Sequence, residues 1–328
     1  MLENIKRVSF KHKNNKLLYY VKNHIRYAFP CYSIYQKLLD TKWASLNGHD
    51  EEYIRYRLNY YNKMDKQYTL PDTAESLADF KLKNHRKVYF FDAFEYTRYF
   101  PLNLKICPLF GDIIHVPEYP AITKSRPIEG DNTNSVIMKL EKLRHFLFLK
   151  DDKTFEEKKD MIVFRGKVRQ EHRIRFMEMY YGKSPRINVG QVNITPDAKY
   201  PAKRLTLSEH LDYKYILSLE GNDVASNLKW VMSSNSLAVM PEPKYETWFM
   251  EGTLIPNHHY VLIRDDYSDL EERMDYYTRH PDEARKIIDN AHQYVEQFKN
   301  KDREDLLNLL VLQKYFEHTG QLDTSIAG

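Results

Sequence analysis

The second half of the chain alternates between strands and helices, and this alternation limits the fold more than any other feature. An apolar strand is predicted at 161–166 (MIVFRG), a helix at 172–182 and a second strand at 186–191. A short helix at 207–212 then runs into the strand YKYILSLE, and more strands and three helices follow. Strands that alternate with helices predict a parallel sheet covered on both faces.

The first half is less regular. Residues 1–85 are predicted to be mostly helical, and short strands are predicted at 87–94 (KVYFFDAF) and 111–119. The proline-containing stretch 120–135 is typical of a loop. A helix is predicted at 135–149, because its leucines recur on one face.

A charged, glycine-free connector at 150–160 (KDDKTFEEKKD) separates the two halves. A chain of 328 residues is long enough for two domains. We therefore expect domains at 1–150 and 151–300, with a C-terminal helix and tail at 301–328 that is free to pack back on the first domain.

The charge is concentrated at the N-terminus. The chain has a net charge of +4, yet residues 1–29 alone hold seven Lys or Arg and one acidic residue. Two interpretations stay open for this basic end: a solvated helix, or contact with an anionic membrane surface. The remainder is nearly balanced and shows no nucleic-acid-binding motif, which argues against a nucleic-acid partner.

Localisation is predicted from absent signals. No run of about 18 apolar residues predicts a membrane span, and the N-terminus lacks the apolar core of a secretory signal. The two cysteines, Cys31 and Cys107, form no metal or disulfide pattern and are interpreted as reduced thiols. These features predict a cytoplasmic protein, with association at the cytoplasmic face of a membrane left open by the basic end.

The first candidate site is the segment FRGKVRQEHR (164–173), where an apolar strand ends. In an open parallel sheet, ligands bind outside the carboxyl ends of the strands. Arg165 precedes Gly166, and glycine lets a backbone approach a ligand closely. The basic residues that follow are Lys167, Arg169, His172 and Arg173. This concentration of cations predicts a diphosphate cradle, since the planar arginine group matches phosphate oxygens; a solvated basic turn is the alternative.

The second candidate site is LEGNDVASNLKW (219–230). A strand ends in Glu220 and Gly221, and Ser226 is suited to cap a helix that starts at Asn227. Helix N-termini bind phosphate through free N–H groups, and Lys229 would add a charge. A plain capped helix explains the pattern equally well.

The absence of three common nucleotide-binding motifs limits the kinds of donor site that the chain can form. No two aspartates stand two residues apart, so the Asp-x-Asp element that holds a metal–nucleotide complex is absent. Neither a P-loop nor a GxGxxG motif occurs. His258 and His259 precede a strand predicted at 259–265 and favour a structural or hydrogen-bonding role over metal ligation. We expect no metal and no cofactor.

These segments, taken in order, resemble glycosyltransferase family 90, and within it the bacterial lipopolysaccharide inner-core enzymes. The resemblance covers about 160–295 and extends back to about 111 through KSRPIEGDNTNSV. It implies an α/β fold of GT-B type, in which two Rossmann-like domains face a cleft. Residues 1–150 would then form the acceptor side and 151–300 the nucleotide-sugar domain.

The resemblance also implies residue roles. Lys167 and Arg173 match donor-contacting positions, and Ser226 matches the second nucleotide segment. The family often has Arg two residues after that serine, whereas this chain has Leu228. The full donor-binding set expected here is Arg165, Gly166, Lys167, Arg173, Glu220, Gly221, Ser226, Asn227 and Lys229.

On the acceptor side, Pro117–Pro120 (PEYP) is similar to the Arg-Asp-Tyr-Pro element that carries the base in the glucosyltransferases. Glu118 is therefore the candidate general base and Asp112 the alternative. Lys124 and Arg126, expected in a loop, are candidates for binding a phosphorylated acceptor.

Together these residues predict metal-independent, inverting transfer of a hexose, glucose or galactose, from a UDP-sugar. The acceptor expected is a hydroxyl of a lipopolysaccharide or lipooligosaccharide inner-core sugar, heptose in particular. Two alternatives stay open: an enzyme like the protein O-glucosyltransferases, and a non-catalytic sugar-nucleotide-binding module.

Overall fold

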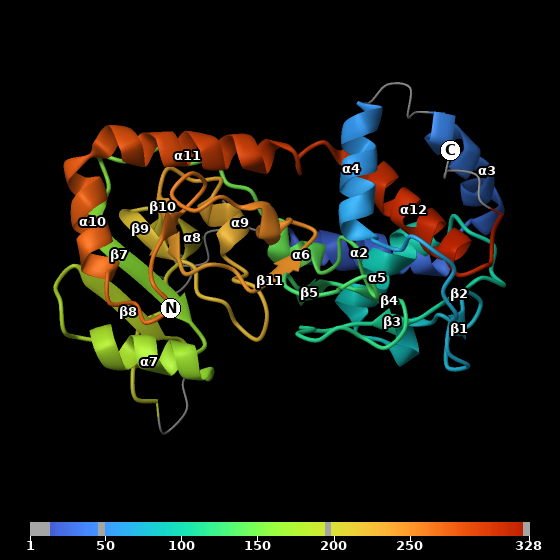
Figure 1. The fold of residues 1–328 in the computed structure, drawn as a ribbon, viewed down its shortest axis with the longest axis horizontal. Coiled ribbons are helices and arrows are strands. Elements are labelled where there is room, and N and C mark those ends of the chain that lie inside the picture. Colours follow the sequence, from blue (N-terminus) through green and yellow to red (C-terminus); the bar gives the residue numbers. More distant parts are fainter. Residues whose placement is uncertain (1–13, 45–49, 194–197, 324–328) are drawn as a thin grey trace. The chain divides into compact units, whose positions relative to one another are not determined.

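The computed structural model describes residues 14–44, 50–193 and 198–323 (Figure 1). The chain forms two compact units, and each is described by itself. The sheet unit contains Arg144–Pro243 and Thr253–Gln297, whereas the helix-rich unit contains Lys16–Leu143, Lys244–Gly252 and the chain from Phe298.

The sheet unit is built on a five-stranded parallel sheet in the order β12-β10-β9-β7-β8. The strands are β7 (Lys159–Gly166), β8 (Ile187–Gln191), β9 (Tyr213–Leu217), β10 (Leu237–Met240) and β12 (Val261–Leu262). The helices are α7 (Glu171–Tyr180), α8 (Leu207–His210), α9 (Leu228–Val231), α10 (Leu270–Arg279) and α11 (Pro281–Glu296). Figure 1 shows α7 on one side of the sheet and α11 on the other.

Local sequence explains where these elements begin and what they bury. All four residues of β10 are buried, as expected of a central strand covered on both faces. Helix α8 opens with a capping box, in which Thr206 and Glu209 satisfy each other's backbone N–H groups. Helix α11 starts at Pro281 and has two acidic residues in its first turn, which suits the positive end of the helix dipole.

The helix-rich unit consists of helices and several short strands. Its helices are α2 (Lys16–Ala28), α3 (Tyr32–Ala44), α4 (Glu51–Tyr61), η2 (Leu82–Asn84), α5 (Lys87–Thr97) and α12 (Lys301–His318). Its strands are β1 (Glu75–Ser76), β2 (Lys105–Ile106), β3 (Pro108–Leu109), β4 (Ala121–Thr123), β5 (Ser125–Pro127), β6 (Ser135–Ile137) and β11 (Tyr245–Thr247). Two short helices, α6 (Lys142–His145) and η3 (Glu251–Thr253), cross the limits between the units.

The core of the helix-rich unit contains paired charges as well as apolar side chains. Arg57 forms a 2.6 Å ion pair with Glu304 of α12, and Lys139 approaches the same carboxylate at 2.9 Å. Trp248 donates its indole N–H to Glu304 as well. The two cations therefore share the Glu304 carboxylate, so that each buried charge lies beside one of opposite sign.

Helix α12 runs through this unit and is buried along most of its length, from Leu306 to Tyr315 and beyond. Asn300 caps its start by accepting a hydrogen bond from the Arg303 N–H. The helix packs against α4 and α5, which explains why its sequence is apolar on more than one face.

Several predicted elements are confirmed in the sheet unit, but four predictions between residues 87 and 149 are wrong. Residues 87–94 form helix α5 instead of a strand, and 111–119 form no strand. The predicted helix at 135–149 is strand β6 followed by the four-residue α6, and the predicted loop 120–135 contains β4 and β5. A buried helix that is apolar all round and a buried strand both read as continuous apolar runs, so periodicity alone cannot separate them.

None of the helices in the described part of the chain is both long enough and apolar enough to span a bilayer.

Candidate functional site

The strand order of the sheet unit defines a switch point between β7 and β9. Numbered along the chain, the strands lie in the order 2-1-3-4-5, because β8 lies on one side of β7 and β9, β10 and β12 follow on the other. In open α/β sheets, ligands bind outside the carboxyl ends of the strands at such a reversal. Here those ends are Gly166 of β7 and Leu217 of β9.

The two segments singled out in the sequence meet at this point. The Arg173 side chain, from the first turn of α7, donates through Nε to the Glu220 carbonyl at 2.8 Å and through Nη2 to the Leu219 carbonyl at 2.7 Å. Its third donor, Nη1, reaches the Lys167 carbonyl at 2.7 Å. His172 Nε2 lies 2.8 Å from the Glu220 carbonyl oxygen. Arg173 thereby ties the loop after β7 to the loop after β9.

Arg173 forms no direct ion pair among the described residues. Its guanidinium donates to three backbone carbonyls, and the charge of the nearby Glu220 carboxylate attracts it without a salt bridge. Burial outweighs this attraction and lowers the pKa of Arg173 to about 10, which still leaves the guanidinium charged at neutral pH. The Phe164 ring lies 5.5 Å from the guanidinium carbon. A bound anion would supply a direct counter-charge at this position.

The two glycines near Arg173 differ in how closely they are packed. A Cβ placed on Gly166 would lie 2.4 Å from Cζ of Phe164, so a larger residue there would require the Phe164 ring to move. Lys167 and Arg169 follow and are exposed. A Cβ on Gly221 would lie 3.5 Å from Arg173 Nη2, an ordinary contact, so Gly221 is not required for the same reason.

Arg165 also belongs to the expected donor set, but neighbouring strands occupy its guanidinium. It donates to the Lys203 carbonyl at 2.8 Å and to both the carbonyl and the side-chain oxygen of Asn188, at 2.8 and 2.7 Å. Burial lowers the pKa of Arg165 as well. These contacts support the end of the sheet.

The second segment differs locally from the prediction. Helix α9 begins at Leu228 and has four residues, with Asn227 at the cap position instead of Ser226. The Asn227 side chain donates to the Leu217 carbonyl at 3.0 Å and therefore fastens the loop to β9. Lys229 is fully buried, so its ammonium group is not presented at the surface. The short helix and the buried lysine leave the first segment as the main source of exposed positive charge.

In the helix-rich unit, the two candidate acceptor-binding cations are buried. Arg126 belongs to strand β5, so its predicted placement in a loop is wrong, and none of its surface is exposed. Its guanidinium bonds to Glu246 at 2.8 Å and to the Tyr60 carbonyl at 2.6 Å. Lys124 is 1% exposed and pairs with Asp112 at 2.6 Å. Both side chains are thus committed to contacts within the unit.

The two candidate bases differ in how they are held. Glu118 is exposed and lines a cavity of about 570 Å³. Asp112 is half-buried and is fixed by the ammonium group of Lys124. His85 and Glu75 also line this cavity and lie 2.9 Å apart. They belong to no common sequence motif, so no signal in the sequence could have identified this pair. Burial raises the pKa of Glu75, although His85 opposes this.

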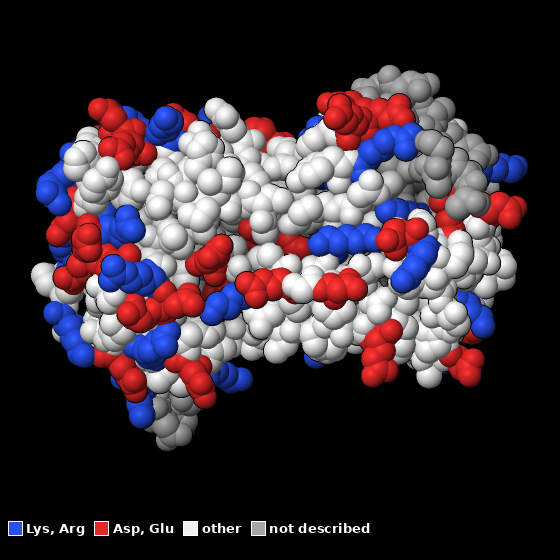
Figure 2. Space-filling model, viewed as in Figure 1, with Lys and Arg blue, Asp and Glu red and all other residues white. Residues whose placement is uncertain are grey.

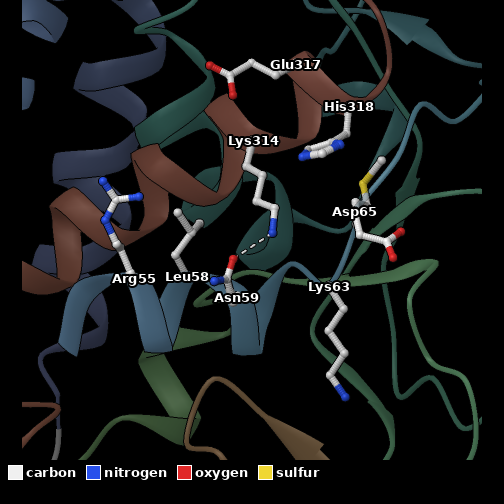
Figure 3. A pocket seen from close by; sticks show the side chains of 9 residues that line it. Arg55, Leu58, Asn59, Lys63, Asp65, Lys314, Glu317 and His318 are labelled. Carbon is white, nitrogen blue, oxygen red and sulfur yellow. Dashed lines mark hydrogen bonds between the residues drawn. The ribbon is translucent and has the colours of Figure 1, made fainter. Parts of the chain in front are cut away.

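A second cavity of the helix-rich unit, of about 470 Å³, lies between α4 and α12 (Figure 3). Leu58 and Met64 form its apolar part, and Lys314 extends into it. The Lys314 ammonium donates to the Asn59 side chain and to the Asn62 carbonyl, both at 2.8 Å. Burial lowers the pKa of Lys314. Asp65 and Glu317 also line the cavity and oppose this lowering, so the cavity carries charges of both signs.

The histidine pair shows no metal-binding geometry. His259 accepts a hydrogen bond at Nδ1 from the Ile255 N–H at 2.9 Å, and burial lowers its pKa to about 4. Among the described residues, no group of three His, Cys, Asp or Glu side chains is placed to hold a metal ion.

Figure 2 shows acidic and basic side chains interspersed over the face in view.

Comparison with known proteins identifies the family. A profile of "Glycosyl transferase family 90" matches residues 132–318. The chain belongs to glycosyltransferase family 90. Family membership makes the chain a glycosyltransferase and sets aside a non-catalytic module.

Individual relatives agree with this assignment. The chain is 44% identical over 264 residues to "O-glucosyltransferase LpsA" of Dichelobacter nodosus, covering 80% of this chain and 82% of that protein. It is 25% identical over 169 residues to "O-glucosyltransferase rumi homolog" of Aedes aegypti, covering 51% and 40% of the two chains. It is 30% identical over 117 residues to "Protein O-glucosyltransferase 3" of Homo sapiens, covering 35% and 23%.

Proposed function

We propose that this glycosyltransferase moves a hexose from a UDP-sugar to a hydroxyl of a lipopolysaccharide inner-core sugar, with inversion and without a metal. The three relatives are named as O-glucosyltransferases, which favours glucose as the sugar and an oxygen as the acceptor atom. The inner-core acceptor, heptose in particular, follows from the resemblance to the bacterial enzymes.

One observation carries the donor half of this proposal: Arg173 lies at the switch point without a direct ion pair among the described residues, and exposed Lys167 and Arg169 follow the same strand end. A nucleoside diphosphate departs with extra negative charge in the transition state. Preorganised cations and backbone N–H groups in a partly dehydrated site stabilise such charge without reorganising. In a chain without an Asp-x-Asp element, these cations would do the work that a metal does elsewhere.

The acceptor half requires a general base. We propose a carboxylate of the 111–119 loop, with Glu118 and Asp112 as the two candidates. Similarity to the Arg-Asp-Tyr-Pro element favours Glu118. Geometry favours Asp112, because a catalytic group must be held within a narrow range of positions and the buried Lys124 fixes this carboxylate at 2.6 Å.

The proposal is tested by offering UDP-glucose and UDP-galactose to the purified chain with truncated lipopolysaccharide acceptors. We expect transfer from UDP-glucose. The activity should persist in the presence of a chelator, and the product should be the β-anomer. A product with retained anomeric configuration, or activity abolished by the chelator and restored by a divalent cation, would overturn the mechanism. Transfer to a folded peptide domain instead of the saccharide would favour the protein O-glucosyltransferase alternative.

The base is identified by comparing Glu118→Gln with Asp112→Asn. Loss of a general base lowers kcat by about 10²–10⁴-fold while UDP affinity stays at the wild-type value. One of the two variants should show this loss and the other should not. Wild-type kcat in both variants would remove the 111–119 loop from the proton transfer.

A further inference from the structure

Helix α2 and the residue after it expose an apolar surface that no other described part of the chain covers. Along one face, Leu17, Val21, Ile25 and Phe29 recur every four residues, with exposed fractions of 74%, 46%, 58% and 71%. Leu18 lies beside them and is 62% exposed. Large apolar side chains exposed singly are common, but a contiguous row of this kind marks an interaction surface.

The opposite face of α2 explains why this row points outward. Tyr19 donates to the Asp92 carboxylate of α5 at 2.8 Å, and Arg26 bonds to Glu95 of α5 at 2.5 Å. The Tyr27 ring packs edge-on against Phe90. The helix is therefore fastened to α5 by aromatic and polar side chains, which is the reverse of the usual arrangement in which the aliphatic face is buried.

Helix α3 continues this pattern after a break at Pro30 and Cys31. Its Tyr35 ring packs on Tyr99, and Gln36 donates to the Phe100 carbonyl, so this face of α3 is held by the unit. Ile34 and Leu38, one turn apart, are 57% and 41% exposed. We call the seven exposed side chains the apolar row: Leu17, Leu18, Val21, Ile25, Phe29, Ile34 and Leu38.

The charge around the apolar row has one sign. Lys16, Lys22 and Lys37 are exposed, and the sequence from residue 16 to residue 39 contains no aspartate or glutamate. A helix that combines exposed aliphatic and aromatic side chains with lysines binds in the plane of an anionic membrane surface. Each basic residue near such a surface adds about 1 kcal/mol of attraction.

We infer that the apolar row docks on the surface of an anionic lipid bilayer, with α2 lying in the interfacial plane. A second copy of the chain is a poorer occupant, because a symmetric pairing would bring the lysines of one row against those of the other. The inference goes beyond the proposed function: it concerns where the enzyme works. Docking would bring a soluble catalyst to a lipid-linked acceptor.

The test is flotation of the full chain with vesicles of phosphatidylcholine alone or with about one third phosphatidylglycerol, near physiological salt. We expect the wild type to float with the anionic vesicles only. Ile25→Ser should lower the bound fraction by about fivefold or more, as lost burial of one large side chain implies. Ile255→Ser is the matched control, since Ile255 is 54% exposed in the sheet unit, and it should bind like the wild type.

Two charge-reversal variants, a test and a control, complete the experiment. Lys16→Glu/Lys22→Glu should remove the dependence on anionic lipid, whereas Lys286→Glu, an exposed site of α11, should not. Absence of flotation by the wild type, or an equal loss in Ile255→Ser, would overturn the inference. So would a concentration-dependent dimer, detected by sedimentation, that Ile25→Ser dissociates while no variant changes vesicle binding.

Failure of this inference is distinguishable from failure of the proposed function. Transfer to a water-soluble saccharide and UDP affinity do not depend on a bilayer, so Ile25→Ser should keep both. A variant that loses vesicle binding and keeps transfer supports docking, whatever the acceptor proves to be.

Discussion

Two arginines that the sequence marks as site residues, Arg173 in the sheet unit and Arg126 in the helix-rich unit, have opposite surroundings. Arg126 is fully buried and bonds to the Glu246 carboxylate at 2.8 Å. Arg173 bonds to three backbone carbonyls and forms no ion pair in the described part of the chain. The first charge therefore has a carboxylate in direct contact, whereas the second has only the longer-range attraction of Glu220.

The same contrast extends to the surrounding residues. The helix-rich unit pairs Arg57 and Lys139 with Glu304 and pairs Lys124 with Asp112. At the switch point of the sheet unit, Lys167 and Arg169 are exposed. A cation with a buried carboxylate partner stabilises the fold, whereas a cation held at a strand end without one is suited to an anionic ligand. The presence or absence of a buried carboxylate partner therefore distinguishes structural from donor-binding cations better than residue type does.

The largest effect is expected from breaking a buried pair. Arg126→Leu leaves the Glu246 carboxylate buried without its cation, which should lower the free energy of unfolding by about 3–5 kcal/mol. Urea denaturation of the purified variant measures this. The double variant Arg126→Leu/Glu246→Leu should recover most of the loss, because no charge then remains unpaired. A loss below about 1 kcal/mol in the single variant would mean that the pair is not structural.

A second prediction compares two acids on helix α5. Burial raises the pKa of Asp92 to about 6, whereas Lys142 and Arg26 outweigh burial and hold the pKa of Glu95 well below its usual range. In the folded state Asp92 binds a proton that the unfolded state has already released between about pH 4 and 6. Its contribution is therefore present at low pH and is lost as the pH rises through about 6.

The expected size of this effect is on the order of 2–3 kcal/mol, since one pKa unit corresponds to about 1.4 kcal/mol. Urea denaturation at pH 4.5, 5.5 and 7 measures it in wild type and in Asp92→Asn. The variant should lose the part of the pH dependence that falls between about 4 and 6. An unchanged slope would assign that dependence to other groups.

The third prediction concerns Arg173 beside the strand end. Arg173→Ala should weaken UDP binding by about 10–100-fold, as expected for a lost charge-assisted contact of about 1.4–2.7 kcal/mol. Calorimetric titration with UDP measures the affinity. Arg175→Ala is the matched control, because Arg175 is an exposed residue of the same helix, and it should bind UDP like the wild type. Equal losses in both variants would mean that the helix, and not the charge at position 173, is responsible.

The smallest effect is expected at the exposed edge of the site. Lys167→Ala should weaken UDP binding by about 3–5-fold at low salt, and the difference from the wild type should shrink at about 0.5 M salt. Lys286→Ala is the control and should leave UDP binding unchanged at both salt concentrations. A loss at Lys167 that does not depend on salt would indicate a direct, dehydrated contact instead of a screened one.

Much of the sheet unit follows from its sequence alone. The strand and helix alternation after residue 160 is local, and the strand ending at Gly166 and the helix through Arg173 are where the pattern predicts them. Basic side chains placed just after a strand were enough to identify the first candidate segment. The helix-rich unit is different: residues 89–94 of the apolar run are all buried, and nothing local distinguishes a buried helix from a buried strand.

The α/β character of the sheet unit, its basic strand end and its membership of glycosyltransferase family 90 can therefore be predicted from the order of residues. Contacts in three dimensions were needed to show that β7 and β9 are neighbours at a reversal of strand order, which brings Arg173 against Glu220. They were also needed to show that Arg126 has a direct ion pair, whereas Arg173 has none among the described residues. The reason is physical: strand order and charge pairing depend on contacts between residues far apart in the chain, and no local pattern encodes which partner each will meet.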